Sequence, residues 1–173
     1  MLYALRQLLS VAILPFVVTV VIPLWIARDE RTTPSLGSTP LELTAQTLGA
    51  ASLALGLWLF GYSLRHFAIR GRGTLAPWDP PRTLVVSGPY RYVRNPMISG
   101  VVFILFAEAL LLRSTAHAVW ALGFLAANFV VIPLIEEPQL ETRFGESYRE
   151  YTRHVGRLIP RLRPWDGSTL PDA

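Results

Sequence analysis

The chain has 173 residues, of which 51% are apolar and only 16% are charged, and its mean hydropathy is positive. An ordinary soluble domain carries about a quarter charged residues, so the composition points to a membrane protein. The basic residues are all arginines, and the formal net charge is +4. These arginines cluster beside apolar runs, which argues against nucleic-acid binding and for anchoring at an anionic leaflet of the lipid bilayer.

Cysteine is absent, and only three histidines occur. The lack of cysteine excludes disulfides, a nucleophilic thiol and Cys-ligated metals. His66, His117 and His154 are far apart in the sequence and form no metal-ligand pattern. We therefore expect no metal site.

The first apolar run, residues 8–27, is long enough to cross roughly 30 Å of hydrocarbon. Pro15 and Pro23 lie inside it, which neighbouring helices in a membrane can accommodate. A cleaved signal peptide is the competing interpretation. However, the run is long for one, and charged residues 28–31 follow it where a small-residue cleavage site belongs.

Three further apolar runs follow, at 43–64, 97–112 and 116–135. The first half of run 43–64 is rich in glycine and alanine, which lets membrane helices pack closely. Only residues 113–115 separate the last two runs, so we expect a tight helical hairpin there. The sequence thus predicts an all-α fold: one polytopic membrane domain, 1–173, with four spans.

The distribution of arginine predicts the orientation. Residues 65–95 carry six arginines and four prolines, which indicates an ordered interfacial loop, and the tail 136–173 carries six more arginines. The connections at 28–42 and 113–115 are poor in arginine. By the positive-inside rule both termini lie in the cytoplasm. An all-arginine composition is typical of a GC-rich bacterium, so we expect the inner membrane.

The tail begins with a pattern typical of an amphipathic helix. Its apolar positions recur at spacings of three and four, and Pro160 and Pro164 are expected to end it. Two pairs on the outer face, Glu146 with Arg149 and Glu150 with His154, are spaced to interact. The apolar stripe comprises Leu140, Phe144, Tyr148, Tyr151 and Val155.

Polar residues that could bind a ligand or take part in a reaction gather at the open end of the predicted hairpin, here called the hairpin mouth. Asn95-Pro96 is a helix-start signal, and a helix N-terminus beside Arg94 attracts anions. Folding the hairpin about its turn brings Glu136 and Glu137 to nearly the same membrane depth as Arg94 and Asn95. Such a mouth suits a zwitterion such as S-adenosylmethionine. The alternative is that these side chains only snorkel, cap helix ends and pair.

An ordered set of motifs resembles the isoprenylcysteine carboxyl methyltransferase family, whose wider group includes phospholipid N-methyltransferases. The resemblance covers roughly residues 56–164 and implies a membrane-embedded methyltransferase that uses S-adenosylmethionine. The motifs are Gly88-Pro89-Tyr90-(x)3-Arg94-Asn95-Pro96, Glu136-Glu137-x-x-Leu140, Phe144-Gly145-x-x-Tyr148-x-x-Tyr151 and Arg157-x-x-Pro160.

The resemblance also implies which residues bind the cofactor: Tyr90, Arg94, Asn95, Pro96, Glu136 and Glu137. The eukaryotic pattern reads Arg-His-Pro-x-Tyr, whereas this chain has Asn95 for the histidine and Ile98 for the tyrosine. These departures remove one possible proton acceptor and put the acceptor specificity in question.

We expect a lipophilic or amphipathic methyl acceptor that arrives from the bilayer. A carboxylate acceptor is already anionic, whereas an amine must first lose a proton, so O-methylation is favoured over N-methylation. Arg157 and Glu137 are the candidate catalytic residues, with Arg157 expected to hold an acceptor carboxylate by a bidentate contact. No residue is an obvious base, although a glutamate could serve if burial raised its pKa. Two alternatives are a membrane reductase that uses NADPH and a non-catalytic membrane subunit.

Other polar and aromatic residues have simpler interpretations. Glu108 is an intramembrane carboxylate, for which we expect a structural pair with His117 across the hairpin. Asn128 is expected to bond another helix. The five tryptophans, Trp165 among them, mostly fall near span ends and suggest interfacial anchors.

Overall fold

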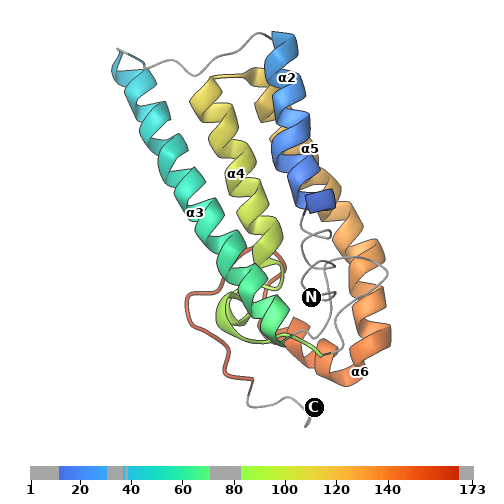
Figure 1. Cartoon of the computed structure of the whole chain (residues 1–173). Helices are drawn as coiled ribbons and strands as arrows, with labels where there is room; N and C mark the ends of the chain where they lie inside the picture. The colour runs from blue at the N-terminus through green and yellow to red at the C-terminus, as the bar shows by residue number, and fades with distance from the viewer. Residues whose placement is uncertain (1–11, 31–36, 38, 71–82, 168–173) are drawn as a thin grey trace.

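The computed structural model describes residues 12–30, 37, 39–70 and 83–167. Within this part of the chain the regular structure is helical, with no strand. Figure 1 shows the long helices α3, α4 and α5 running side by side, with α6 at the opposite end from the α4–α5 turn. The all-α prediction is therefore confirmed for the described residues.

The N-terminal helix consists of η1 (Ala12–Val21), a wide π-helical stretch, and α2 (Ile22–Glu30), which follows it directly. Pro15 lies inside η1, and its carbonyl oxygen accepts from Thr19 Oγ1 at 2.8 Å. The expected start of this span at residue 8 lies outside the described residues. Its helix continues beyond the expected end at residue 27.

Helix α3 (Pro40–Arg70) starts with a reciprocal cap between Thr39 and Glu42. The Thr39 amide donates to Glu42 Oε2 at 3.1 Å, and the Glu42 amide donates to Thr39 Oγ1 at 3.3 Å. Its 31 residues make a helix about 46 Å long. The predicted loop boundary at residue 65 was wrong, because no helix breaker interrupts residues 65–70. Residues 71–82 of that loop lie outside the described part.

Helices α4 (Pro96–Leu112) and α5 (Thr115–Val131) form the predicted tight hairpin. Arg113 closes α4 in the left-handed conformation at φ 51°. Ser114 caps α5, with its Oγ accepting from the His117 amide at 3.1 Å. From α5 the chain continues through η3 (Ile132–Glu136) into α6 (Glu137–His154).

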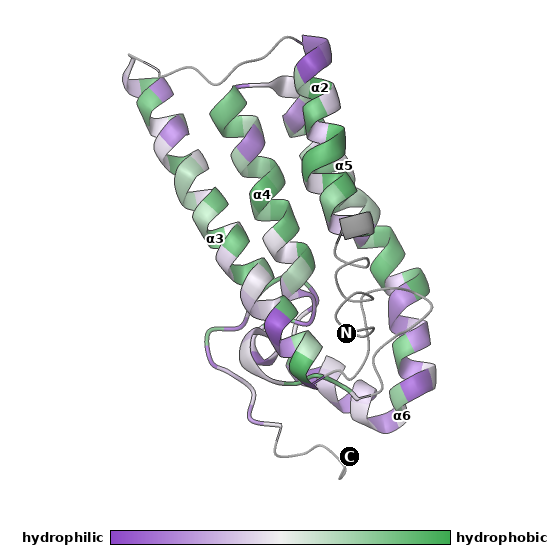
Figure 2. Cartoon of the chain, in the orientation of Figure 1, coloured by the Kyte–Doolittle hydropathy of each residue, from purple (hydrophilic) through white to green (hydrophobic). Residues whose placement is uncertain are grey.

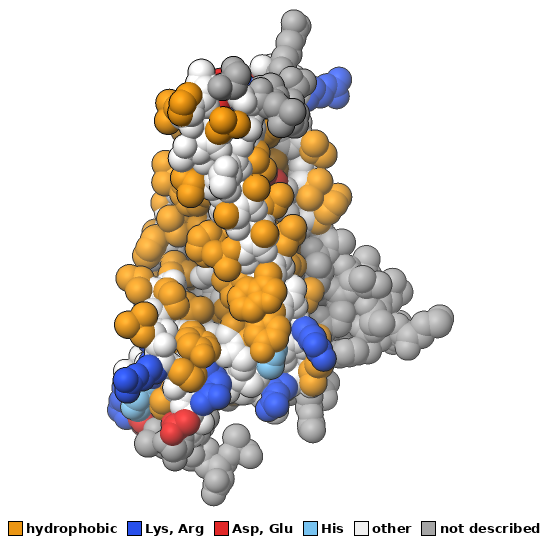
Figure 3. Space-filling view, turned by 90° about the vertical axis from the view of Figure 1, so that its left-hand side faces the viewer, with side chains coloured by type: hydrophobic (Ala, Val, Ile, Leu, Met, Phe, Trp, Pro, Cys, Tyr) orange, Lys and Arg blue, Asp and Glu red, His pale blue; other side chains and the backbone are white. Residues whose placement is uncertain are grey.

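Two helical stretches among the described residues are long and apolar enough to cross a membrane, Pro40–Arg70 and the continuous run Thr115–His154. Pro96–Leu112 is a shorter apolar helix. Figure 2 shows apolar residues along the lengths of α3, α4 and α5, with polar residues at the upper ends of α2 and α3 and along α6 at the lower end. In Figure 3 the arginines on the α3 face gather mainly at that same end. The four-span count stays a prediction.

The contact between α3 and α4 depends on glycines, as the small-residue pattern predicts. A Cβ added at Gly56 would lie 2.8 Å from the carbonyl oxygen of Gly100, and a Cβ added at Gly100 would lie 2.8 Å from the Phe60 amide nitrogen. Ser52 Oγ donates to the Phe103 carbonyl at 2.8 Å across the same interface. This close approach fixes where the start of α4 stands relative to the end of α3.

The predicted pair of Glu108 with His117 was wrong. The His117 ring is buried, and its two nitrogens lie 2.8 Å from Ser114 Oγ and 3.1 Å from the Pro23 carbonyl oxygen. The tight turn and α2 therefore supply both hydrogen-bond partners of the imidazole. Glu108 Oε2 is buried and has no hydrogen-bond partner among the described residues.

The expected bond from Asn128 to another helix was also wrong. Asn128 Nδ2 donates to the Phe124 carbonyl of its own helix at 2.8 Å. A carbonyl one turn earlier is always within reach of such a side chain, so no second helix is needed.

The α3–α4 packing can be tested with Gly100→Ala. The new methyl group meets backbone rather than a flexible side chain, so the helices must separate, at a cost of about 1–3 kcal/mol. Gly123→Ala is the matched control, because nothing lies within 4 Å of a Cβ added there. Thermal unfolding followed by circular dichroism in detergent should show a lower Tm for Gly100→Ala alone. Equal Tm values for the two variants would contradict the interface.

Candidate active site

A short turn before α4 positions the first site residues. In η2 (Gly88–Arg91), Gly88 has φ +56°, and a Cβ there would lie 2.7 Å from Nε2 of His66 on α3. Only glycine combines that conformation with so close a contact. The turn directs Tyr90 into the interior, where its side chain is buried.

Residues 155–165, here called the C-terminal strap, lie along the segment that enters α4. The Arg94 amide donates to the Gly156 carbonyl at 2.9 Å, and the Asn95 amide donates to the Arg157 carbonyl at 3.3 Å. Further along, the strap amides of Arg161 and Trp165 donate back to this segment. The strap therefore holds Arg94 and Asn95 in place through their backbones.

Asn95 occupies the predicted position before α4, with Pro96 at the first helical position, but its side chain does not cap the helix. Instead, Asn95 Nδ2 donates to the Arg157 carbonyl at 3.2 Å. The strap competes successfully for this amide, and the side chain fastens the strap to the start of α4.

Two arginines converge on one carboxylate at the hairpin mouth. Arg94 Nη1 lies 2.9 Å from Glu137 Oε1. Arg157 makes a bidentate contact with the same carboxylate, from Nε to Oε1 at 2.7 Å and from Nη2 to Oε2 at 2.8 Å. The predicted convergence of Arg94 and Glu137 at one depth is therefore present in the structure.

The apolar part of the long helix ends at Ile135, so Glu136 and Glu137 lie beyond it. The hydrogen bonds from Arg157 hold the pKa of the Glu137 carboxyl below its usual range against the opposing effect of burial, and the charge of Arg94 lowers it further. Glu137 is therefore ionised at neutral pH and locked between two guanidinium groups.

The predicted apolar stripe of the tail forms a small core beneath the site. Tyr148, Tyr151, Val155 and Trp165 are buried together, with Leu84, Val86, Leu140 and Phe144 packed against them. The Tyr151 hydroxyl donates to the Tyr90 carbonyl at 2.6 Å.

Helix α6 is kinked at Gly145, where φ is 54° and ψ is −128°, a conformation that glycine alone adopts readily. Because of this kink, the two halves of α6 run in different directions and lie along different sides of the site. The helix ends at His154 because Val155 is extended, so the expected termination at Pro160 and Pro164 was wrong.

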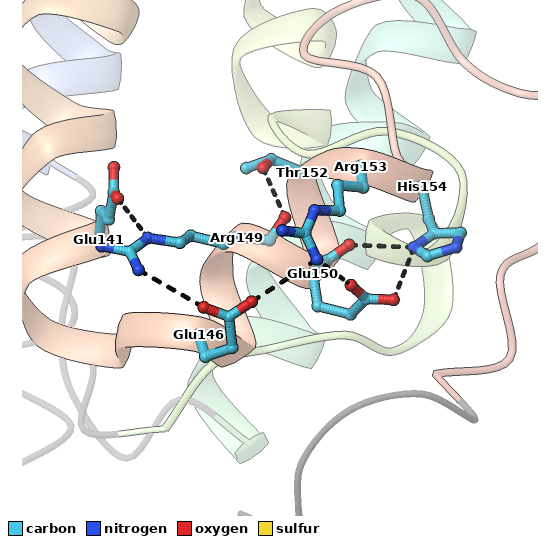
Figure 4. A network of polar contacts seen from close by, with 7 residues as sticks. All are labelled: Glu141, Glu146, Arg149, Glu150, Thr152, Arg153 and His154. Atoms are coloured by element: carbon cyan, nitrogen blue, oxygen red, sulfur yellow. Dashed lines mark hydrogen bonds and ion pairs between the residues drawn. The ribbon is translucent and has the colours of Figure 1, made fainter.

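The outer face of α6 carries ion pairs, shown in Figure 4. Arg149 bridges the kink, with Nε 2.6 Å from Glu141 Oε1 and Nη1 3.4 Å from Glu146 Oε2. His154 Nδ1 lies 3.4 Å from Glu150 Oε1. The two predicted pairs are confirmed, but such exposed contacts contribute little stability.

A cavity of about 660 Å³ opens among η1, the end of α3, the start of α4 and the kinked α6. Its volume lies within the range of roughly 300–1,000 Å³ that is usual for small-molecule sites. One end is polar, and the other lies between apolar residues of the long helices. The polar end includes Tyr90, Arg94, Asn95, Glu136, Arg143 and Tyr148, and the apolar end includes Val18, Phe60, Val101, Phe124 and Val131.

Two donors at the polar end have no partner. The Tyr90 hydroxyl and Arg94 Nε are buried and make no hydrogen bond within the part of the chain that the structure describes. Unpaired buried polar atoms are uncommon in native proteins and call for an explanation such as a ligand. Burial raises the pKa of Tyr90, so its hydroxyl stays protonated and able to donate.

Glu136 differs from its neighbour. Its side chain lines the cavity, and no described residue makes a hydrogen bond or ion pair with its carboxylate. Burial raises the pKa of the Glu136 carboxyl, and the charge of Glu137 raises it further. The cavity thus offers guanidinium and phenol groups as donors and, among its described lining residues, one carboxyl group as an acceptor.

The residues singled out from the sequence fall into two groups. Tyr90, Arg94, Asn95, Pro96 and Glu136 line the cavity, whereas Glu137 and Arg157 lie outside its lining and bind each other. Sequence reasoning gave Tyr148 only a place in an apolar stripe, but its hydroxyl accepts from Arg94 Nη1 at 3.5 Å.

Trp165 is not an interfacial anchor, because it is buried between His154 and Tyr151. No pattern in the sequence distinguishes it from the other tryptophans. Among the described residues, no group of three or more potential ligands could hold a metal ion.

The sequence matches a family model. The model for phospholipid methyltransferases matches residues 44–147, which include both polar segments of the hairpin mouth and end just before Tyr148. This finding agrees with the motif resemblance to the wider group that contains such enzymes.

Curated relatives are bacterial enzymes named for thiol methylation. Methanethiol S-methyltransferase 2 of Bradyrhizobium diazoefficiens is 35% identical over 104 residues, which are 60% of this chain and 37% of that protein. Methanethiol S-methyltransferase of Pseudomonas deceptionensis is 36% identical over 80 residues, 46% of this chain and 29% of that protein. The Mycobacterium tuberculosis enzyme of that name is 33% identical over 72 residues, 41% of this chain and 28% of that protein.

The aligned segments thus span little more than a third of these relatives' length at most. The family model, in contrast, covers more than half of this chain. The chain belongs to the phospholipid methyltransferase family.

Proposed function

We propose that this protein is an integral membrane methyltransferase that transfers a methyl group from S-adenosylmethionine to a lipophilic or amphipathic acceptor. The observation that carries the proposal is the cavity, where two buried unpaired donors and a partner-free carboxyl group meet an apolar end between membrane-type helices. The family membership and the names of the relatives support the same reaction class.

The chemistry of the cavity residues fits this cofactor. When bound, S-adenosylmethionine supplies an electrophilic methyl group on a sulfonium. Arg94 Nε and the Tyr90 hydroxyl would bind the carboxylate of its amino acid part, and the Tyr148 hydroxyl would accept from its ammonium. Glu137 positions Arg94 by pairing with it, and Arg157 positions Glu137.

We place proton transfer at Glu136 rather than Glu137. Both oxygens of Glu137 accept hydrogen bonds from Arg157, whereas Glu136 lines the cavity and has no described partner. A thiol would give its proton to the Glu136 carboxylate as its sulfur bonds to the methyl carbon and the bond from that carbon to the sulfonium breaks; a protonated amine would have to lose its proton to Glu136 before it could attack. A carboxylate acceptor would need no such base.

Because the relatives act on methanethiol by name, a small thiol is the first acceptor to assay, followed by an amphipathic carboxylate. The original candidate for carboxylate binding, Arg157, already makes a bidentate contact with Glu137. A carboxylate acceptor would have to displace that contact, so the geometry favours a neutral nucleophile.

Tyr90→Phe tests the cofactor site. The Tyr90 hydroxyl has no hydrogen-bond partner among the described residues, so its removal should leave Tm unchanged or slightly raised. Loss of a hydrogen bond to a charged ligand, about 1.5–3 kcal/mol, should weaken S-adenosylmethionine binding about tenfold or more. Isothermal titration calorimetry in detergent measures it. Tyr92→Phe is the control, since Tyr92 does not line this cavity. Equal affinities of the two variants for S-adenosylmethionine would show that Tyr90 does not bind the cofactor.

Glu136→Gln tests the proton acceptor. Because the pKa of Glu136 is raised, the reactive carboxylate forms only as pH rises through that value, and kcat for a thiol should climb with it. Glu136→Gln should lower kcat by about 10²–10⁴-fold and abolish this rise. Cofactor affinity in the same variant separates binding from proton transfer. An unchanged pH profile would show that Glu136 is not the base.

We further propose four spans with both termini in the cytoplasm of the bacterial inner membrane. The cysteine-free chain allows single-cysteine labelling without background. On intact cells, with the outer membrane made permeable, an impermeant maleimide should label Thr115→Cys at the hairpin turn. It should label Arg163→Cys only after the inner membrane is opened; both positions are exposed. Labelling of Arg163→Cys but not Thr115→Cys in intact cells would show that the topology is inverted. Equal labelling of both positions before the inner membrane is opened would reject the four-span count.

A further inference from the structure

A second groove, of about 750 Å³, lies on the other side of the segment that leads into α4. It has no lining residue in common with the candidate active site. Within the dividing segment, Tyr90 and Arg94 line the active-site cavity, whereas Arg91, Tyr92 and Val93 line the groove. The groove is therefore a separate compartment, and the methyltransferase chemistry does not account for it.

The walls of the groove are mainly apolar and aromatic. Trp58 stacks on Tyr62 with ring centroids 5.5 Å apart and an interplanar angle of 10°. Trp58 is 61% exposed, and Tyr62, Tyr92 and Phe103 are each more than a third exposed. Figure 3 shows apolar side chains along this α3 face and arginines at its lower end. Aromatic residues with this exposure are typical of the membrane interface.

One cation lies at the groove, and the described lining contains no acidic residue. Arg91 Nε donates to the Trp165 carbonyl at 2.5 Å, and the Arg91 carbonyl accepts from the Trp165 amide at 3.0 Å. No described residue binds the two terminal nitrogens of Arg91. The strap thus fixes the guanidinium and leaves its outer edge open, which is the geometry that binds a phosphate in a bidentate manner.

We propose that this groove binds an anionic phospholipid of the surrounding bilayer, with an acyl chain against Trp58 and Phe103 and its phosphate on Arg91. The apolar walls match the chain, and the fixed guanidinium matches the phosphate charge. A quaternary ammonium headgroup would place its positive charge near Arg91, with no carboxylate among the described lining residues to offset the repulsion. A second copy of the protein on this face would bring identical arginine-rich edges together, which is unfavourable.

The bound lipid would connect α3, the dividing segment and the strap, because all three contribute to the groove. It would therefore stabilise the backbone pairing that holds Arg94 and Asn95 in the neighbouring cavity. This role is independent of methyl transfer, so failure of the proposed function would leave it intact.

The test uses the full chain in nanodiscs in which the mole fraction of brominated phosphatidylglycerol, or of brominated phosphatidylcholine, is raised through the same series of values. The Trp58 signal is the fluorescence difference between the wild type and Trp58→Phe. We expect half-maximal quenching of this signal at an about fivefold lower mole fraction of phosphatidylglycerol, since one arginine near the surface contributes about 1 kcal/mol.

Arg91→Gln should abolish that fivefold preference. Arg163→Gln is the matched control, because Arg163 is an exposed arginine of the same strap and lies outside the groove, and it should retain the preference. Equal quenching by both lipids in the wild type would overturn the proposal and indicate ordinary boundary lipid. An equal loss of the phosphatidylglycerol preference in Arg91→Gln and Arg163→Gln would also overturn it, because general surface charge would then explain the preference. Absence of Trp58 quenching by either lipid would also overturn the proposal, because it would show that no acyl chain lies against Trp58. The wild-type comparison decides the question even if Arg91→Gln does not fold.

Discussion

The arrangement of the candidate site depends on one ion cluster, in which Glu137 binds Arg94 and Arg157 at once. The three residues come from the start of α4, the start of α6 and the strap. The Glu137 carboxylate therefore holds together three segments that are not part of one helix. Arg94 and Glu137 are largely shielded from water, with exposed side-chain fractions of 11% and 18%. Removal of one member of such a group leaves the others uncompensated, which is costly at this degree of burial.

The cluster forms only because the helices beneath it are correctly placed. Glycines set a close contact between α3 and α4, and a two-residue turn makes α4 and α5 a hairpin with ends at one level. The kink at Gly145 then turns the second half of α6 back under the mouth, so that Tyr148 and Tyr151 reach Arg94 and the Tyr90 backbone. Backbone bonds from the strap complete the enclosure.

Much of this could be predicted from sequence, because helix lengths and a short turn are local properties. Counting outward from residue 114 was enough to bring Arg94 and Glu137 together. Pairing with Arg157, in contrast, depends on an irregular strap whose path follows backbone hydrogen bonds that no side-chain pattern encodes. The same limit explains why the burial of Trp165 could not be predicted. The predicted Glu108–His117 pair was wrong because Ser114 and the Pro23 carbonyl supply the hydrogen-bond partners of the imidazole. Spacing predicts proximity, but competition among nearby partners decides the contact.

The two adjacent glutamates show how environment can divide one sequence motif into two roles. Successive residues on a helix point about 100° apart, so only one of them can turn towards the cavity while the other faces the strap. Glu137 meets two guanidinium groups and stays ionised, which suits a fixed structural charge. Glu136 meets the cavity wall and its neighbour's negative charge, so its proton is held more tightly. A fixed anion that pairs with Arg94, set beside a carboxyl group that can exchange a proton, is what a site needs if it is to bind a charged cofactor and deprotonate a neutral acceptor.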